Sequence, residues 1–144
     1  MSVRLTLVIA AVAALGVGAV TTGASQAAPA QGLDYTFFKT RVEPIFMKKR
    51  PGHSPCVVCH TGANNFLRLE ELAPGQTAWN EEQSKKQFES ISKLVTPANR
   101  PQSRLLIHPL APEAGGDLFH SGGRQFESKD DPDYKILMQW VGVQ

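Results

Sequence analysis

Apolar side chains recur every three to four residues in three stretches of the chain, a spacing typical of one face of an α-helix. No stretch alternates apolar and polar residues for long enough to favour a β-strand. The pattern therefore predicts an all-α domain. The three apolar faces are Phe38, Val42, Ile45 and Phe46; Trp79, Phe88, Ile91, Leu94 and Val95; and Tyr134, Leu137, Trp140 and Val141.

Capping residues and prolines set the ends of two of these helices. Asn80, with Gln83 three residues later, has the sequence of a capping box, and Pro97 ends the helix that this box begins. Asp131 followed by Pro132 is typical of an N-cap and the first helical position. We therefore expect one helix to begin at residue 80 and another at residue 131.

The first predicted helix contains a proline. Asp34 is a suitable N-cap for this helix, and Pro44 lies inside it. Proline lacks the backbone N–H, and its ring clashes with the preceding helical turn. We therefore expect a kink, or two short helices that meet at Glu43–Pro44.

A short helix and a long loop are predicted between the two capped helices. Ser103 is expected to cap a helix over residues 104–108, which Pro109 ends. Residues 109–129 are rich in proline, glycine and polar side chains, so they are predicted to form a loop. Long loops in small domains are often functional.

The sequence Cys56-Val57-Val58-Cys59-His60 is the signature of covalent c-type haem attachment. Two thiols about one helical turn apart can each add to one vinyl group of a single haem, and the adjacent His60 then faces the iron. A redox dithiol or a zinc site is the alternative for a bare Cys-x-x-Cys. The chain has only these 2 cysteines, so neither has another disulfide partner. We expect one covalently attached haem c, with His60 as the proximal ligand of its iron.

Residues 1–27 have the features of a secretory signal peptide. Arg4 gives a positive start, Leu5–Val20 is an apolar run, and Ser25-Gln26-Ala27 is a suitable cleavage sequence. An uncleaved membrane anchor is the alternative, although the apolar run is short for a bilayer span. We therefore expect a periplasmic or otherwise extracytoplasmic protein, which agrees with haem attachment outside the cytoplasm.

The rest of the chain is long enough for one small domain. We expect residues 28–33 to be a flexible lead-in and residues 34–144 to form a single cytochrome c-like domain. The 144-residue sequence has 15 Lys and Arg against 13 Asp and Glu, a net charge of +2, and removal of Arg4 with the signal segment lowers this by one. A nearly neutral chain argues against nucleic acid as the partner.

The residue on the other side of the iron determines whether the haem is closed or open to small ligands. Met47 and His53 lie directly before the motif, too close along the chain to reach the opposite face easily. Met138 borders the apolar face of the last helix, so core packing is its expected role. His108 is an alternative ligand or a hydrogen-bond partner of a haem propionate. His120 is the favoured ligand.

His120 is favoured because of its position and its neighbours. It lies far enough along the chain to fold over the opposite haem face, in the long predicted loop. Gly122 and Gly123 let the backbone approach the porphyrin closely, because they carry no side chain. Phe119 and Phe126 are candidate contacts of the porphyrin ring. A surface histidine in a flexible loop is the alternative.

With these motifs the chain resembles the small planctomycete-type cytochrome c domains, also found in acidobacteria. That resemblance implies a mostly helical cytochrome c fold, an electron-transfer role and His120 as second axial ligand. Ser121 stands where the family has a glycine, and the Met-Pro-Pro pattern of other small cytochromes is absent. The resemblance rests on Val42-Glu43-Pro44-Ile45-Phe46, Cys56–His60, Ser103-Arg104-Leu105-Leu106, residues 120–126, Tyr134-Lys135-Ile136-Leu137 and Trp140-Val141.

The predicted function is one-electron transfer to redox partner proteins by a bis-histidine haem, without enzymatic activity. Two imidazoles lack the thioether ligand that raises the potential, so we expect a comparatively low potential. One alternative is a gas sensor or a peroxidase-like enzyme with an open sixth site, although the sequence reveals no acid–base pair near the distal candidates. Another is a subunit of a larger membrane or filament complex.

A basic docking face beside the haem is a further hypothesis for the partner. It would consist of Lys39, Arg41, Lys48, Lys49 and Arg50. An ordinary solvated surface is the alternative, because scattered surface charges are common and contribute little individually.

Overall fold

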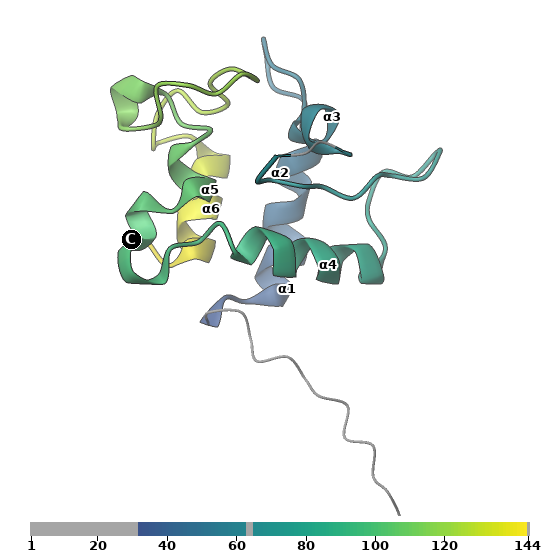
Figure 1. Ribbon diagram of the computed structural model, residues 1–144. Coiled ribbons are helices and arrows are strands. Elements are labelled where there is room, and N and C mark those ends of the chain that lie inside the picture. The colour runs from purple at the N-terminus through teal and green to yellow at the C-terminus, as the bar shows by residue number, and fades with distance from the viewer. Residues whose placement is uncertain (1–31, 63–64, 144) are drawn as a thin grey trace, which may run out of the picture.

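The computed structural model describes residues 32–62 and 65–143, which form helices joined by turns, with no β-strand in those ranges (Figure 1). The prediction of an all-α domain is confirmed. The predicted signal segment and most of the lead-in lie outside the described residues. Leu33, the last residue of that lead-in, is buried at 4% exposure and belongs to the packed core. Within the described ranges, no helix combines the length and apolar character of a bilayer span.

In chain order the elements are α1 Tyr35–Phe37, the π-helical segment Phe38–Val42, α2 Glu43–Met47, α3 Cys56–His60, α4 Glu81–Ser92, a 3₁₀ helix Pro97–Gln102, α5 Arg104–Ile107, a 3₁₀ helix Pro112–Ala114 and α6 Pro132–Val141. The first three elements follow one another without a break and form the N-terminal helix, around which the others pack. α6 lies against the π-helical segment, α4 crosses the same segment, α3 packs on α2, and α5 packs on α6 (Figure 1).

The predicted capping residues begin α4 and α6 as expected. Asn80 accepts a hydrogen bond from the Gln83 N–H, and the Gln83 side chain accepts one from the Asn80 N–H. Asp131 accepts from two backbone N–H groups of the first turn of α6. Ser103 differs from expectation, because its hydroxyl accepts from the Thr96 N–H instead of capping α5. Ser103 therefore holds the preceding turn to α5.

The helix passes Pro44 through a local change of helical register. The Glu43 N–H donates to the Phe38 carbonyl, an i→i+5 bond that defines the π-helical segment. Pro44 then occupies the first turn of α2, where a backbone N–H has no helical partner, so the missing N–H of proline costs no hydrogen bond. The predicted disturbance at Glu43–Pro44 is therefore present as a π-helical stretch in an otherwise continuous helix.

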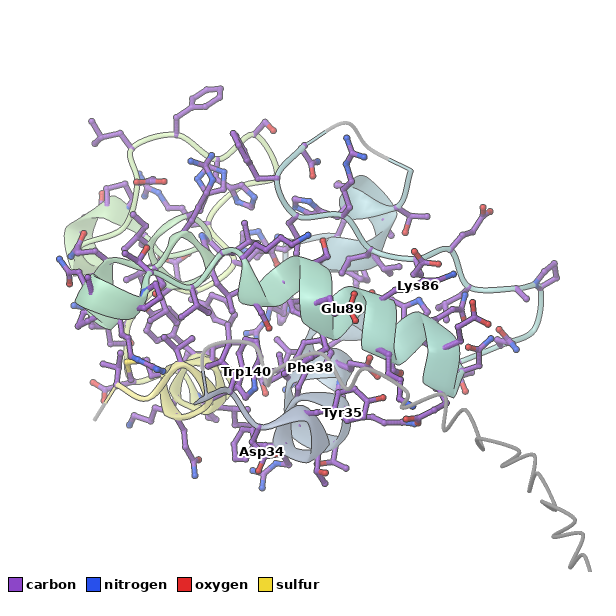
Figure 2. The ribbon with its side chains drawn as sticks, turned by 60° about the horizontal axis from the view of Figure 1, so that its bottom comes forward. Asp34, Tyr35, Phe38, Lys86, Glu89 and Trp140 are labelled. Carbon is purple, nitrogen blue, oxygen red and sulfur yellow. The ribbon has the colours of Figure 1, made fainter. Side chains whose placement is uncertain are left out.

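An aromatic cluster joins the N-terminal helix, α4 and α6. Phe38 packs against Phe88 and Trp140, with ring centroids 5.5 and 5.2 Å away, and Tyr35 meets Phe88 edge-on at 5.3 Å. Figure 2 shows Tyr35, Phe38 and Trp140 along one side of α4. The indole N–H of Trp140 donates to the Asp34 carbonyl at 2.9 Å, so the last helix is tied to the start of the first.

Arg50 connects the loop before the Cys-x-x-Cys-His motif to the C-terminal half of the chain. Its guanidinium pairs with the carboxylates of Asp131 and Asp133, and it lies 4.4 Å from the centre of the Phe126 ring. Lys48 also reaches Asp133, at 2.7 Å. Burial alone would raise the pKa of Asp131, but the backbone N–H donors and the Arg50 charge together hold it below its usual value.

Three of the five cations proposed as a docking face are paired with carboxylates. Lys48 and Arg50 are in the cluster just described, and Lys39 pairs with Glu81 on α4. Lys49 donates to the His53 carbonyl at 2.8 Å. These contacts favour the alternative of an ordinary solvated surface.

Glu43 carries a buried carboxyl group whose charge opposes folding. It is 5% exposed, its Oε2 accepts from the Ser84 hydroxyl, and its Oε1 has no hydrogen-bond partner among the described residues. Burial raises the pKa of Glu43 above 4.5 and nearby Glu81 adds to this, while the Ser84 hydroxyl and the Lys39 charge lower it only in part.

Stability should therefore fall with rising pH on account of Glu43. The unfolded chain releases this proton near pH 4.5 and the folded chain releases it at higher pH, so unfolding becomes easier as the pH rises through that interval. We expect Glu43→Gln to raise the free energy of unfolding at pH 7 by about 1 kcal/mol. Urea titrations between pH 4 and pH 8 measure it, with the exposed Glu89→Gln as control. A constant difference across that range would contradict the prediction.

Candidate functional site

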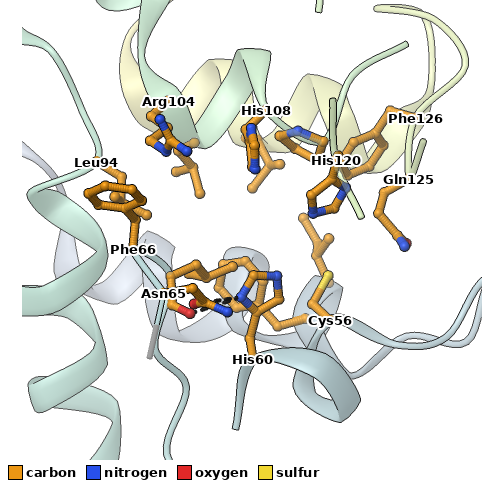
Figure 3. A pocket seen from close by; sticks show the side chains of 16 residues that line it. Cys56, His60, Asn65, Phe66, Leu94, Arg104, His108, His120, Gln125 and Phe126 are labelled. Atoms are coloured by element: carbon orange, nitrogen blue, oxygen red, sulfur yellow. Dashed lines mark hydrogen bonds between the residues drawn. The ribbon is translucent and has the colours of Figure 1, made fainter. Parts of the chain in front are cut away.

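A largely apolar pocket lies between α3 on one side and α5 with the 109–129 loop on the other (Figure 3). Its empty space is about 700 Å³, part of it open to solvent. The apolar wall is built from the N-terminal helix, α5, α6 and the 109–129 loop, and it includes Ile45, Phe46, Leu105, Phe126 and Leu137. The pocket therefore suits a large apolar ligand.

His60 and His120 face each other across this pocket (Figure 3). Their ring centroids are 6.2 Å apart and their planes differ by 18°. Two imidazoles that bind one metal ion from opposite sides would have centroids about 6 Å apart, given metal–nitrogen bonds of about 2.0–2.1 Å. The spacing therefore fits one metal ion between the rings.

Both histidines use Nδ1 for hydrogen bonds to the protein. Nδ1 of His60 lies 2.8 Å from the Leu67 carbonyl and 3.1 Å from Oδ1 of Asn65, and Nδ1 of His120 lies 2.6 Å from the Gly123 carbonyl. A carbonyl only accepts, so each Nδ1 carries the proton and each Nε2 keeps its lone pair. A hydrogen bond from the other ring nitrogen to a protein oxygen is typical of metal-ligating histidines.

The His120 ring rests on a glycine turn. The Gly123 N–H donates to the His120 carbonyl, and Gly123 has a φ of +82°, which favours glycine. A Cβ on Gly122 would lie 3.4 Å from the His120 ring. Burial lowers the pKa of His120, and nearby His108 and His60 add to this, while the hydrogen bond to the Gly123 carbonyl opposes it in part. The two predicted glycines thus position the histidine ring itself.

The two cysteines occupy different environments on α3. Cys56 lines the pocket and is partly buried, whereas Cys59, one helical turn later, is exposed. Burial raises the pKa of the Cys56 thiol. A redox-active dithiol has a lowered thiol pKa instead, so this environment weakens that alternative.

The other ligand candidates are distributed differently. His108 lines the pocket, with its ring 4.7 Å from that of His120. His53 and Met138 are partly buried outside the lining, as is Met47. Phe126, a predicted ring contact, lines the pocket, but Phe119 is 79% exposed and lies outside the lining, because the loop directs it toward solvent.

Two features of the pocket were not expected from the sequence. Nδ1 of His108 lies 2.7 Å from a carboxylate oxygen of Asp117, so an acid–base pair does stand beside His120. Arg104 is the one Lys, Arg, Asp or Glu side chain among the described lining residues, and its guanidinium lies 4.3 Å from the centre of the Phe66 ring. Neither contact leaves a local sequence pattern by which it could be predicted.

The donor set of the pocket fits haem. Figure 3 shows Arg104 and Phe66 across the pocket from Cys56. The vinyl and propionate groups of haem lie at opposite edges of the porphyrin, so Cys56 would meet one edge and the Arg104 cation the other. No group of three or more His, Cys, Asp or Glu within residues 32–62 and 65–143 is arranged for a bare metal ion.

Comparison with known protein families, curated proteins and solved structures finds no match for this chain. The resemblance to small cytochrome c domains therefore stays a prediction from sequence motifs.

Proposed function

We propose that this chain is an exported c-type cytochrome that transfers single electrons. One haem would be attached through Cys56 and Cys59, with its iron between His60 and His120. The observation that carries the proposal is the 6.2 Å spacing of two rings whose Nε2 lone pairs are free, across an apolar pocket that Cys56 lines. The resemblance to small cytochrome c domains supports the same conclusion.

Haem supplies a ferric/ferrous couple when bound, and the residues of the chain hold it in one coordination state. The Leu67 carbonyl and the Asn65 side chain orient His60, and the Gly123 carbonyl orients His120. The apolar walls of the pocket would keep water from most of a bound ring. Ligands that stay in place in both oxidation states limit rearrangement, which suits electron transfer.

Spectra of the purified holoprotein in both oxidation states test the proposal. We expect a c-type haem that is low-spin when oxidised and when reduced, with a near-infrared band typical of bis-histidine ligation. Because the rings differ by only 18°, the oxidised protein should give a rhombic low-spin EPR signal rather than a large-gmax signal. If cells that attach haem to c-type cytochromes export this protein without covalent haem, the proposal is overturned.

Carbon monoxide distinguishes the proposed carrier from the alternative with an open sixth site. A native ferrous protein with both imidazoles bound should bind carbon monoxide only slowly, because His120 must leave first. Rapid binding without denaturant would favour a sensor or peroxidase-like enzyme. Membership of a larger complex is compatible with either result and would be tested by its copurification from membranes.

Arg104 should raise the reduction potential. A cation beside the haem favours the state with one more electron, so Arg104→Gln should lower the midpoint potential. The expected size is about 1 kcal/mol, or roughly 40 mV for a one-electron couple. Spectroelectrochemical titration measures the shift. The matched control is Arg41→Gln, an exposed arginine outside the pocket, and an equal shift in both variants would contradict a specific role.

A further inference from the structure

We propose that the pair of His108 and Asp117 is a positioning device that fixes the plane of the His120 ring. The inference rests on the proposed function, because it concerns how the second axial imidazole is held. The ring of His108 meets that of His120 at 4.7 Å with an interplanar angle of 65°, and Asp117 holds Nδ1 of His108 at 2.7 Å. In this proposal His108 supports the His120 ring by packing against it and is not itself a ligand.

The backbone anchors both members of the pair. His108 caps the end of α5, where its N–H donates to the Arg104 carbonyl, and the Asp117 N–H donates to the Ile107 carbonyl at 2.9 Å. The turn at the end of α5 thus fixes the backbone of both His108 and Asp117. Asp117 can therefore hold the His108 ring without rearrangement of the chain.

The side chains between Asp117 and His120 are turned toward solvent. Leu118 is 92% exposed and Phe119 is 79% exposed. The His120 ring is instead held by its hydrogen bond to the Gly123 carbonyl and by the ring of His108, which meets it at 4.7 Å. Loss of the pair would therefore remove a side-chain ring that packs against His120.

These contacts restrain rotation of the His120 ring. Rotation about its Cβ–Cγ bond would break the 2.6 Å hydrogen bond to the Gly123 carbonyl and drive the ring into His108. His60 is fixed separately by Leu67 and Asn65. The His108–Asp117 pair therefore helps to fix the plane of the His120 ring, which is one of the two planes that define the 18° angle.

EPR spectroscopy reports this angle directly. Nearly parallel axial imidazoles give ferric haem a rhombic low-spin signal, whereas perpendicular ones give a large-gmax signal. We expect His108→Ala and Asp117→Ala to remain low-spin, with loss of the rhombic signal in favour of a large-gmax signal. The conservative variant Asp117→Asn should keep the rhombic signal of the wild type, because its amide oxygen still accepts from the His108 Nδ1–H.

The matched control is Asp130→Ala, an exposed aspartate that pairs with Lys135 away from the pocket. It should leave the signal unchanged. Carbon monoxide should enter the ferrous Asp117→Ala variant about tenfold faster than the wild type, because a less restrained His120 leaves more readily. Circular dichroism establishes that each variant is folded, and a variant that fails to fold is replaced by His108→Gln and Asp117→Ser.

The outcomes separate the inference from the function on which it rests. An unchanged rhombic signal in both His108→Ala and Asp117→Ala overturns the positioning role and leaves the bis-histidine carrier intact. A high-spin His108→Ala variant also overturns it, because His108 would then be the ligand itself. A wild-type protein that is not low-spin refutes the proposed function before the variants are compared.

Discussion

Replacing His120 with glycine should convert the low-spin spectrum to a high-spin one in both oxidation states. The variant removes one of the two imidazoles that face each other at 6.2 Å. Glycine is tolerated in a loop that already turns through Gly123, so the domain should fold. Visible absorption measures the conversion, which we expect to be nearly complete. The reduced variant should also bind carbon monoxide rapidly, because nothing has to leave the iron.

Added imidazole provides the sharpest check on this result. It should enter the cavity that the lost side chain leaves and restore the low-spin spectrum, which a generally misfolded variant would not show. Phe119→Gly is the matched control, because Phe119 directly precedes His120 in the same loop, is 79% exposed and lies outside the pocket lining. A low-spin spectrum that persists in His120→Gly without imidazole would remove His120 from the ligand role. Comparison with His108→Gly would then identify the ligand.

The parts of the fold that the sequence predicts well depend on neighbouring residues. Asn80 and Gln83 form their capping box within one helical turn, and Asp131 caps the turn that follows it. Helix α3 places Cys56 and Cys59 one helical turn apart, as the motif predicts. Local hydrogen bonds and steric limits decide these features, so the pattern of residue types is sufficient to predict them.

Two kinds of feature escaped prediction. One is the choice between competing local hydrogen bonds, as at Ser103, whose hydroxyl accepts from Thr96 instead of capping α5. The other is contact between residues far apart in the chain. Arg50 meets Asp131 and Asp133 more than 80 positions later. His108 and Asp117 are nine positions apart, yet their pairing depends on how the loop folds back on α5. Packing of the whole chain creates these contacts. The acid–base pair beside His120 therefore became evident only from the arrangement in space.

Replacing both Cys56 and Cys59 with alanine should abolish covalent haem and strongly destabilise the holoprotein. α3 has only five residues and no side-chain cap, so it is too short to be stable alone. In the wild type, two thioether bonds would hold haem at an effective concentration in the millimolar range or above. Without them, two imidazoles and the apolar walls must retain the haem alone. We expect it to dissociate on dilution to micromolar protein.

Haem staining of a denaturing gel and mass spectrometry of the intact protein measure this effect. The wild type should carry the added mass of one haem, and the double variant none. Cys59→Ala is the matched single variant, because the pocket-lining Cys56 can still form one thioether. It should keep the haem stain. A double variant that still stains would place the attachment elsewhere, and a wild type without added mass would return the Cys-x-x-Cys sequence to the dithiol alternative. The raised pKa of the Cys56 thiol already argues against that alternative.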